Sequence, residues 1–178
     1  MHDLIQGEMI MLKLSKKTVF FAILATSLIT MPVSYAADSG QGSAGLILMK
    51  ASDVKFHPAP GFPKGAQIIL LRGDLSQAVP YTIRFKLPDG FVIPAHWHST
   101  DEEVTVLSGT LNVGLGDKVD KAQSTALTAG GFQIVPANAH HYVWASGETI
   151  MQLDGMGPRT TVFVNPEEWT AMIKASNK

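Results

Sequence analysis

Short runs of apolar or alternating residues, broken by glycine, proline, aspartate and asparagine, constrain the fold of this chain more than any other feature. In the run at 79–90, the apolar residues Tyr81, Ile83 and Phe85 alternate with polar ones. Comparable runs recur at residues 66–74, 102–117, 131–136, 140–155 and 159–165. Strands of this length, separated by turn residues and without a helical period between them, are typical of sandwiches and barrels. The sequence therefore predicts an all-β fold.

Two local features refine this prediction. Ser108 and Gly109 separate two alternating runs, so we expect a turn between two strands there. The end of the chain instead predicts a short C-terminal helix, with Asn165 as its cap and Pro166 at its first position.

The first 36 residues differ in kind from the rest of the chain. An apolar run at 18–33 follows three lysines, and the small residues Ser34 and Ala36 stand where a signal peptidase requires them. A membrane anchor is the alternative. The run carries four hydroxyl residues and a proline, however, and a membrane span needs about 20 apolar residues. The pattern favours a signal peptide cleaved after Ala36.

The expected organisation is a signal peptide at 1–36, a small and polar flexible tail at 37–45, and one domain at 46–178. The mature protein would then be periplasmic or secreted, without stable membrane insertion. The sequence leaves the true start open among Met1, Met9 and Met11.

Charge and cysteine content exclude some classes of function. The formal net charge is -1, and no cluster of basic residues interleaved with aromatics follows residue 40, so we expect no nucleic-acid partner. The chain has no cysteine, which excludes disulfides, thiolate ligands and a cysteine nucleophile.

Histidines mark the candidate chemistry. Two of the six stand at 96 and 98, ahead of Glu102 and Glu103, and two more stand at 140 and 141. Alternate residues of a strand share a face, so His96 and His98 would point to one side and Trp97 to the other. Imidazole and carboxylate together suit a divalent Fe, Mn, Zn, Ni or Cu ion. A lone pair of surface histidines beside a polar turn would be the ordinary explanation, but two clusters in so small a protein favour one metal site.

At these residues the chain resembles the cupin family. The first motif of the family is glycine, five residues, His-x-His, three or four residues, glutamate, six residues and glycine, and every element is present from Gly90 to Gly109. The second motif is matched by Gly130, Pro136 and His141. It departs from the family at Asn138, which replaces a glycine, and at Ala145, which replaces an asparagine. Asn138 is a mild departure, because asparagine tolerates positive φ.

The resemblance implies a small double-stranded β-helix, the cupin jelly-roll barrel, around one divalent metal. By motif position the implied ligands are His96, His98, Glu102 and His141. Glu102 is preferred to Glu103 and His141 to His140, because only they keep the motif spacing. His140 should face away from the barrel interior.

Three classes of function remain open on this scaffold, because a fold and its ligands do not fix a reaction. The first is a metal-dependent dioxygenase that acts on a small organic molecule. The second is a redox-neutral decarboxylase or isomerase in which the metal acts as a Lewis acid. The third is a non-catalytic protein that binds a small molecule or metal. Candidate cavity-lining residues are Ile83, Phe85, Phe132 and Met151. A homodimer is a possible assembly that the sequence does not decide.

Overall fold

The computed structural model describes residues 45–178. The expected signal peptide at 1–36, and all of the expected tail except Gly45, lie outside the described residues. The elements of the described part, in chain order, are η1 Ala51–Asp53, β1 His57–Pro58, β2 Gln67–Arg72, β3 Pro80–Leu87, β4 Val92–His98, β5 Glu102–Leu115, η2 Lys121–Gln123, β6 Thr125–Thr128, β7 Phe132–Val135, β8 His141–Met156, β9 Thr161–Phe163 and α1 Pro166–Ser176.

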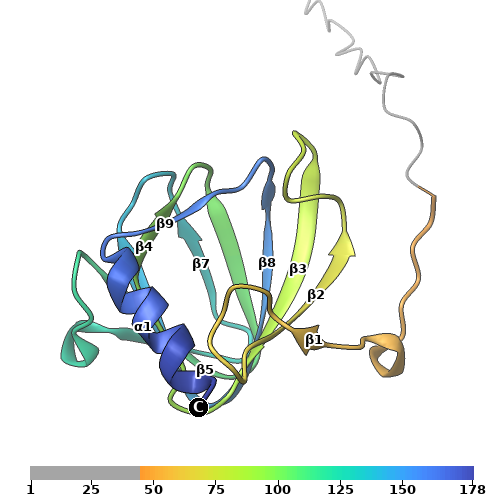
Figure 1. The fold of residues 1–178 in the computed structure, drawn as a ribbon. Helices are drawn as coiled ribbons and strands as arrows, with labels where there is room; N and C mark the ends of the chain where they lie inside the picture. The colour runs from red at the N-terminus through yellow and green to blue at the C-terminus, as the bar shows by residue number, and fades with distance from the viewer. Residues whose placement is uncertain (1–44) are drawn as a thin grey trace, which may run out of the picture. The chain divides into compact units, whose positions relative to one another are not determined.

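Strand β8 is the centre of the sheet (Figure 1). Along one side it pairs with β5, and along the other its first half pairs with β4 and its second half with β3. The outer strands extend from these neighbours: β2 and β1 from β3, β9 from β4, and β6 and β7 from β5. All of these pairings are antiparallel, and the strands curl around one apolar core. The predicted all-β jelly-roll barrel with a short C-terminal helix is confirmed.

Strand β5 differs from its prediction. The chain does not turn back at Ser108 and Gly109 but continues as one 14-residue strand. Gly109 has φ 75°, and the register against β8 shifts on both sides of Ser108, as in a bulge that bends a strand. A Cβ at Gly109 would overlap the Glu148 carbonyl on β8. Gly109 therefore lies at a bend where the backbones of β5 and β8 approach closely, and not in a hairpin turn.

The bends position the site. Glu102 at the start of β5 pairs with Gly155, whereas His141 at the start of β8 pairs with Leu115, so the two residues stand at opposite ends of one ladder. A straight ladder of this length would hold them far apart. Because β5 is bent, both side chains reach the same interior space.

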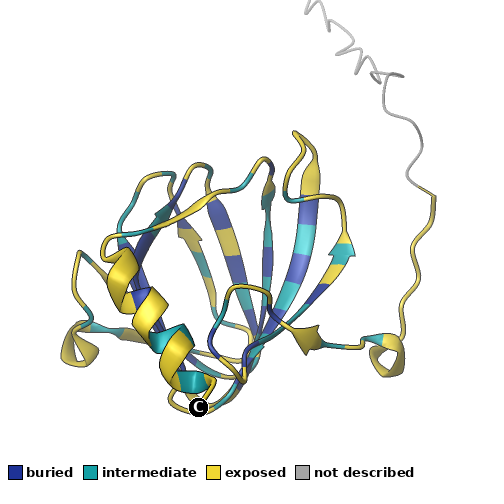
Figure 2. Ribbon diagram, viewed as in Figure 1, coloured by how far each residue is buried: buried dark blue, intermediate teal, exposed yellow. Residues whose placement is uncertain are grey.

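The core follows the alternation of the sequence. Along β3, Tyr81, Ile83, Phe85 and Leu87 are buried, while the residues between them are partly exposed. Figure 2 shows the same alternation of buried and more exposed residues along the long strands. The buried residues of the long strands line the inside of the barrel, and the metal-site candidates are among them.

Helix α1 has the predicted cap. The Asn165 side chain accepts a hydrogen bond from the Glu168 amide at 3.2 Å, and Pro166 opens the helix. Its buried residue Trp169 stacks on Phe163 of β9, with ring centroids 4.5 Å apart, and meets Phe62 edge-on at 5.2 Å. The helix is thereby held against the loop before β2 and against β9. Within residues 45–178, no helix combines the length and the apolar character needed to cross a membrane.

Candidate metal centre

Four polar side chains from three strands meet in the interior of the barrel. His96 and His98 come from β4, Glu102 from the start of β5 and His141 from the start of β8. Strand pairing brings the two histidine clusters together, because His96 lies directly opposite His141 in the β4–β8 ladder. All four residues are at most 5% exposed.

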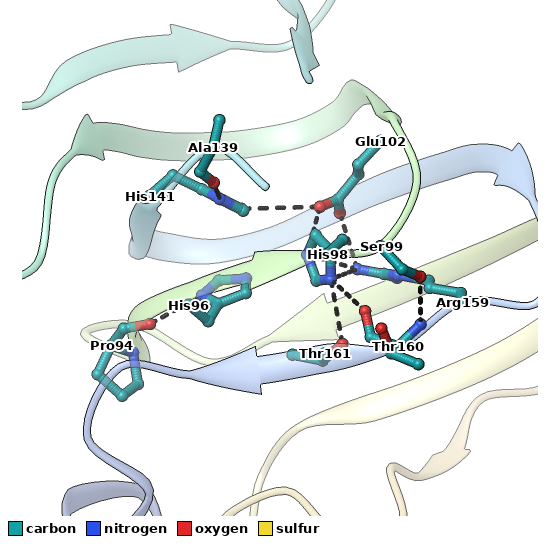
Figure 3. A network of polar contacts seen from close by, with 10 residues as sticks. All are labelled: Pro94, His96, His98, Ser99, Glu102, Ala139, His141, Arg159, Thr160 and Thr161. Carbon is teal, nitrogen blue, oxygen red and sulfur yellow. Dashed lines mark hydrogen bonds and ion pairs between the residues drawn. The ribbon is translucent and has the colours of Figure 1, made fainter. Parts of the chain in front are cut away.

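The ligand atoms of these residues lie close enough to share one ion. One nitrogen of each histidine and one Glu102 oxygen all lie within 4.8 Å of one another. Glu102 Oε2 is 2.8 Å from His98 Nε2 and 3.7 Å from His141 Nε2 (Figure 3). The rings of His96 and His141 are 4.2 Å apart between centroids. The four residues that the cupin resemblance implied are therefore the four that the fold brings together.

Backbone carbonyls orient all three imidazoles. His96 Nδ1 contacts the Pro94 carbonyl at 2.8 Å, His98 Nδ1 the Thr160 carbonyl at 3.0 Å, and His141 Nδ1 the Ala139 carbonyl at 3.1 Å (Figure 3). A carbonyl oxygen only accepts, so each Nδ1 carries the proton and each neutral ring has its lone pair on Nε2. This second layer of contacts is the usual way in which a protein orients histidines towards a metal.

The surroundings of the site favour a neutral His96 and an ionised Glu102. Burial, with smaller contributions from the neighbouring His141 and His98, lowers the pKa of His96 to about 3. Burial alone would raise the pKa of Glu102, but the Arg159 guanidinium and the adjacent imidazoles outweigh it, so this pKa lies well below its ordinary value. Neutral imidazole and ionised carboxylate are the forms that bind metal.

Glu102 Oε2 supports a cation at this place. It is buried, and no group in residues 45–178 donates a well-aligned hydrogen bond to it, although His98 Nε2 stands 2.8 Å away. With the His98 proton on Nδ1, that short contact sets two lone pairs against each other. A cation between them would satisfy both, since an unpaired buried polar group costs roughly 1–3 kcal/mol. The donor set and its geometry therefore fit a metal ion, and the cluster could hold one.

His140 faces away from the site, as predicted. Its Nδ1 contacts the exposed carboxylate of Asp117, and its ring lies parallel to that of Trp97, with a 9° angle between the planes. Trp97 is on the outer face of β4, between the two inward histidines. The adjacent His140 and His141 thus have different surroundings, which makes His140 a matched control for the site.

The candidate site opens into a cavity of about 240 Å³. Most of its wall is apolar and includes Ile83, Phe85, Met151, Phe62 and Phe163. Pockets for drug-sized ligands usually measure about 300–1,000 Å³, so this cavity suits a smaller molecule. Ile83, Phe85 and Met151 line it as predicted. Phe132 does not: it lies on β7 with 53% of its surface exposed, because its side of that strand faces out of the barrel.

Arg159 also reaches the site, although no sequence motif indicates it. It belongs to the connection between β8 and β9, and its Nη2 lies 2.8 Å from His98 Nε2 and 3.3 Å from Glu102 Oε1. The stretch GMGPRTT around it lies outside both cupin motifs. Only the pairing of β9 with β4, which sets Thr161 beside His98, places this arginine at the site.

Comparison with known families agrees with this geometry. The model of the cupin domain family matches residues 83–165, a stretch that contains all four candidate ligands and Arg159. Residues 83–165 therefore form a cupin domain. Among curated proteins, none matches this sequence. Both cupin motifs lie within the matched stretch, including the second, with its substitutions at Asn138 and Ala145.

Solved structures share the cupin fold at low sequence identity. One is the polyketide cyclase RemF from Streptomyces resistomycificus, with a TM-score of 0.58 and 17% identity over 74% of this chain and 98% of that one. Another is a putative acetylacetone dioxygenase from Methylibium petroleiphilum PM1, with a TM-score of 0.56 and 23% identity over 71% of this chain and 86% of that one. At these identities the likeness concerns the fold.

Proposed function

We propose that this cupin is an exported metal-dependent protein that acts on a small organic molecule, with dioxygenase chemistry as the leading candidate. One observation carries the proposal. Three imidazoles held in the same tautomer by backbone carbonyls, together with one ionised carboxylate, converge at the wall of a small apolar cavity. Such a site would hold the metal and present a dry space beside it.

Each part of the chain has a definite role in this proposal. His96, His98, Glu102 and His141 would hold one divalent ion, for which the nitrogen and oxygen donors suit Fe, Mn, Zn, Ni or Cu. The ion would polarise a bound oxygen atom or, if redox-active, support reaction with O₂. The apolar wall, Phe62 and Phe163 included, would bind the body of the substrate and exclude water.

A redox-neutral reaction is the second candidate, and the fold does not select between the two. The solved structures that share the fold include one named as a polyketide cyclase and one named as a putative acetylacetone dioxygenase. Two such different activities on one scaffold illustrate that chemistry belongs to the site rather than to the fold. A non-catalytic small-molecule or metal-binding role is the third.

Metal content tests the site. His141→Ala should remove most of the bound metal, since it deletes a ligand whose Nε2 faces the cluster, whereas His140→Ala should keep it. Elemental analysis of the wild type and both variants gives the answer. Full metal in His141→Ala, or equal loss in both variants, would contradict the assignment.

Reaction class is tested on the same loaded protein. Oxygen uptake should rise when protein loaded with Fe(II) meets its substrate from a panel of diketones, flavonols and catechols. Isomerised product or CO₂ without oxygen uptake would favour the redox-neutral candidate. Binding without turnover would favour the non-catalytic one.

A further inference from the structure

Arg159 lies mostly buried at the wall of the cavity, and its protein neighbours do not satisfy all of its hydrogen-bond donors. Its side chain is 9% exposed, and its backbone amide is fixed by a 2.8 Å hydrogen bond to the Leu75 carbonyl. Its Nε has no hydrogen-bond partner anywhere in residues 45–178. A buried guanidinium with a free donor that borders a cavity is unusual, because such groups are normally paired.

The contacts that Arg159 does make compete with a metal. Nη2 lies 2.8 Å from His98 Nε2, and this nitrogen holds the lone pair that a metal would accept, since Nδ1 faces the Thr160 carbonyl. One lone pair cannot serve both partners. Loading of the site would therefore release Nη2 from His98, and Arg159 would then hold at least two unsatisfied donors beside the ion.

The charges that line the cavity also indicate that the loaded site lacks one component. Apart from the three histidines, Glu102 and Arg159 are the two ionisable residues among those that line it. These two charges cancel, with Nη2 and Oε1 3.3 Å apart. A divalent ion would leave its own charge uncompensated in a mostly apolar space, which is costly. The missing component of the loaded site is an anion.

We propose that Arg159 recognises the carboxylate group of the ligand, so that the natural ligand is a small apolar carboxylate. A planar guanidinium matches a carboxylate through paired hydrogen bonds, and such charge-assisted bonds are stronger than neutral ones. The apolar wall of the 240 Å³ cavity would take the hydrocarbon part. This inference rests on the proposed function, because the metal is what frees the arginine.

The experiment compares matched ligands on protein loaded with Zn(II), which is redox-inert. Benzoate and hexanoate are titrated by calorimetry beside their neutral counterparts, benzamide and hexanamide. In Arg159→Gln the carboxylates should bind about 10- to 100-fold more weakly, as expected for loss of a charged hydrogen bond. The amides should change by less than about threefold. Arg159→Lys keeps the charge without the planar group, so its carboxylate affinity should lie between those of the wild type and Arg159→Gln.

Arg84→Gln is the matched control. Arg84 is a partly buried arginine of β3 whose Nε donates to Gln152 Oε1 at 3.0 Å, and it does not line the cavity. This variant should bind every ligand as the wild type does. Metal content is measured in parallel, and Arg159→Gln should retain its zinc because the substitution removes a competing cation.

Several results would overturn the inference. These are absence of carboxylate binding in the loaded wild type, equal carboxylate affinity in Arg159→Gln, or an equal loss in Arg84→Gln. Loss of zinc from Arg159→Gln would show that the arginine supports the metal site instead. A wild type that takes up no zinc would contradict the proposed function and the inference with it, because the metal is what frees the arginine. A loaded wild type that binds no carboxylate would contradict the inference alone.

Discussion

Three backbone carbonyls decide which nitrogen of each histidine faces the cavity. Two of them, from Pro94 and Ala139, lie two residues before the histidine they bind, so local strand geometry sets them. The third, from Thr160, reaches His98 across the β4–β9 pairing. The orientation of the site is therefore built into the backbone. A metal would find imidazoles already in the required tautomer, which lowers the cost of organising them.

The pKa of His96 gives a prediction for the metal-free protein. His96 takes up a proton near pH 6.5 in the unfolded chain but only near pH 3 in the folded one. Between these values the unfolded state binds more protons, so the free energy of unfolding should fall as pH falls from 6.5 towards 3. Above pH 6.5 this residue causes no loss of stability. Below pH 6.5 it lowers the free energy of unfolding by at most about 1.4 kcal/mol per pH unit.

Urea unfolding of metal-free wild type and His96→Gln at pH 7.5, 5.5 and 4.5 measures this effect. The variant should lose less stability between pH 7.5 and 4.5 than the wild type. Parallel curves for the two proteins would show that His96 is not buried as a neutral base.

At the scale of the element, the turn before β8 connects the two motifs. Asn138 has φ 64°, the left-handed conformation that its place in the second motif predicts. Its amide donates to the His98 carbonyl at 2.9 Å, and the next residue, Ala139, supplies the carbonyl that orients His141. One turn thus contacts the backbone of one ligand and fixes the ring of another.

Substitution of Asn138 should therefore affect the metal without touching a ligand. Asn138→Val should cost about 1–3 kcal/mol, because a β-branched residue is strained at this φ, and it should weaken metal binding as the Ala139 carbonyl shifts. Asn138→Gly is the control and should keep both stability and affinity, since glycine takes this conformation without strain. Urea unfolding and calorimetric metal titration are the measurements. Unchanged metal affinity in Asn138→Val would show that this turn does not position His141.

For the whole molecule, the sequence predicts features that depend on neighbouring residues better than features that depend on which strands pair. Alternation along β3 and the cap at Asn165 are encoded in neighbouring residues, and motif spacing identified His96, His98, Glu102 and His141. Arg159 was missed because its place depends on which strand β9 joins, and no local signal specifies that. The turn predicted at Gly109 is wrong, because glycine at positive φ occurs both in turns and in bent strands. Only the tertiary contact with Glu148 distinguishes the two.

The N-terminal segment carries the last prediction, which concerns the whole chain. The sequence of residues 1–36 predicts cleavage after Ala36, so the mature protein should begin at Ala37. Amino-terminal sequencing of the protein from the extracytoplasmic fraction tests this. An intact Met11 in the membrane fraction would contradict cleavage and favour an anchored form.

The order of the elements along the chain has a consequence for the cavity wall, because the pieces that close the wall follow the strands that carry the ligands. All four candidate ligands lie on β4, β5 and β8, whereas Arg159, β9 and Trp169 of α1 come after β8. The segment after β8 supplies the arginine that competes for His98 and the tryptophan that packs behind Phe62 and Phe163. Detachment of this segment would therefore open the cavity without removing any of the four donors.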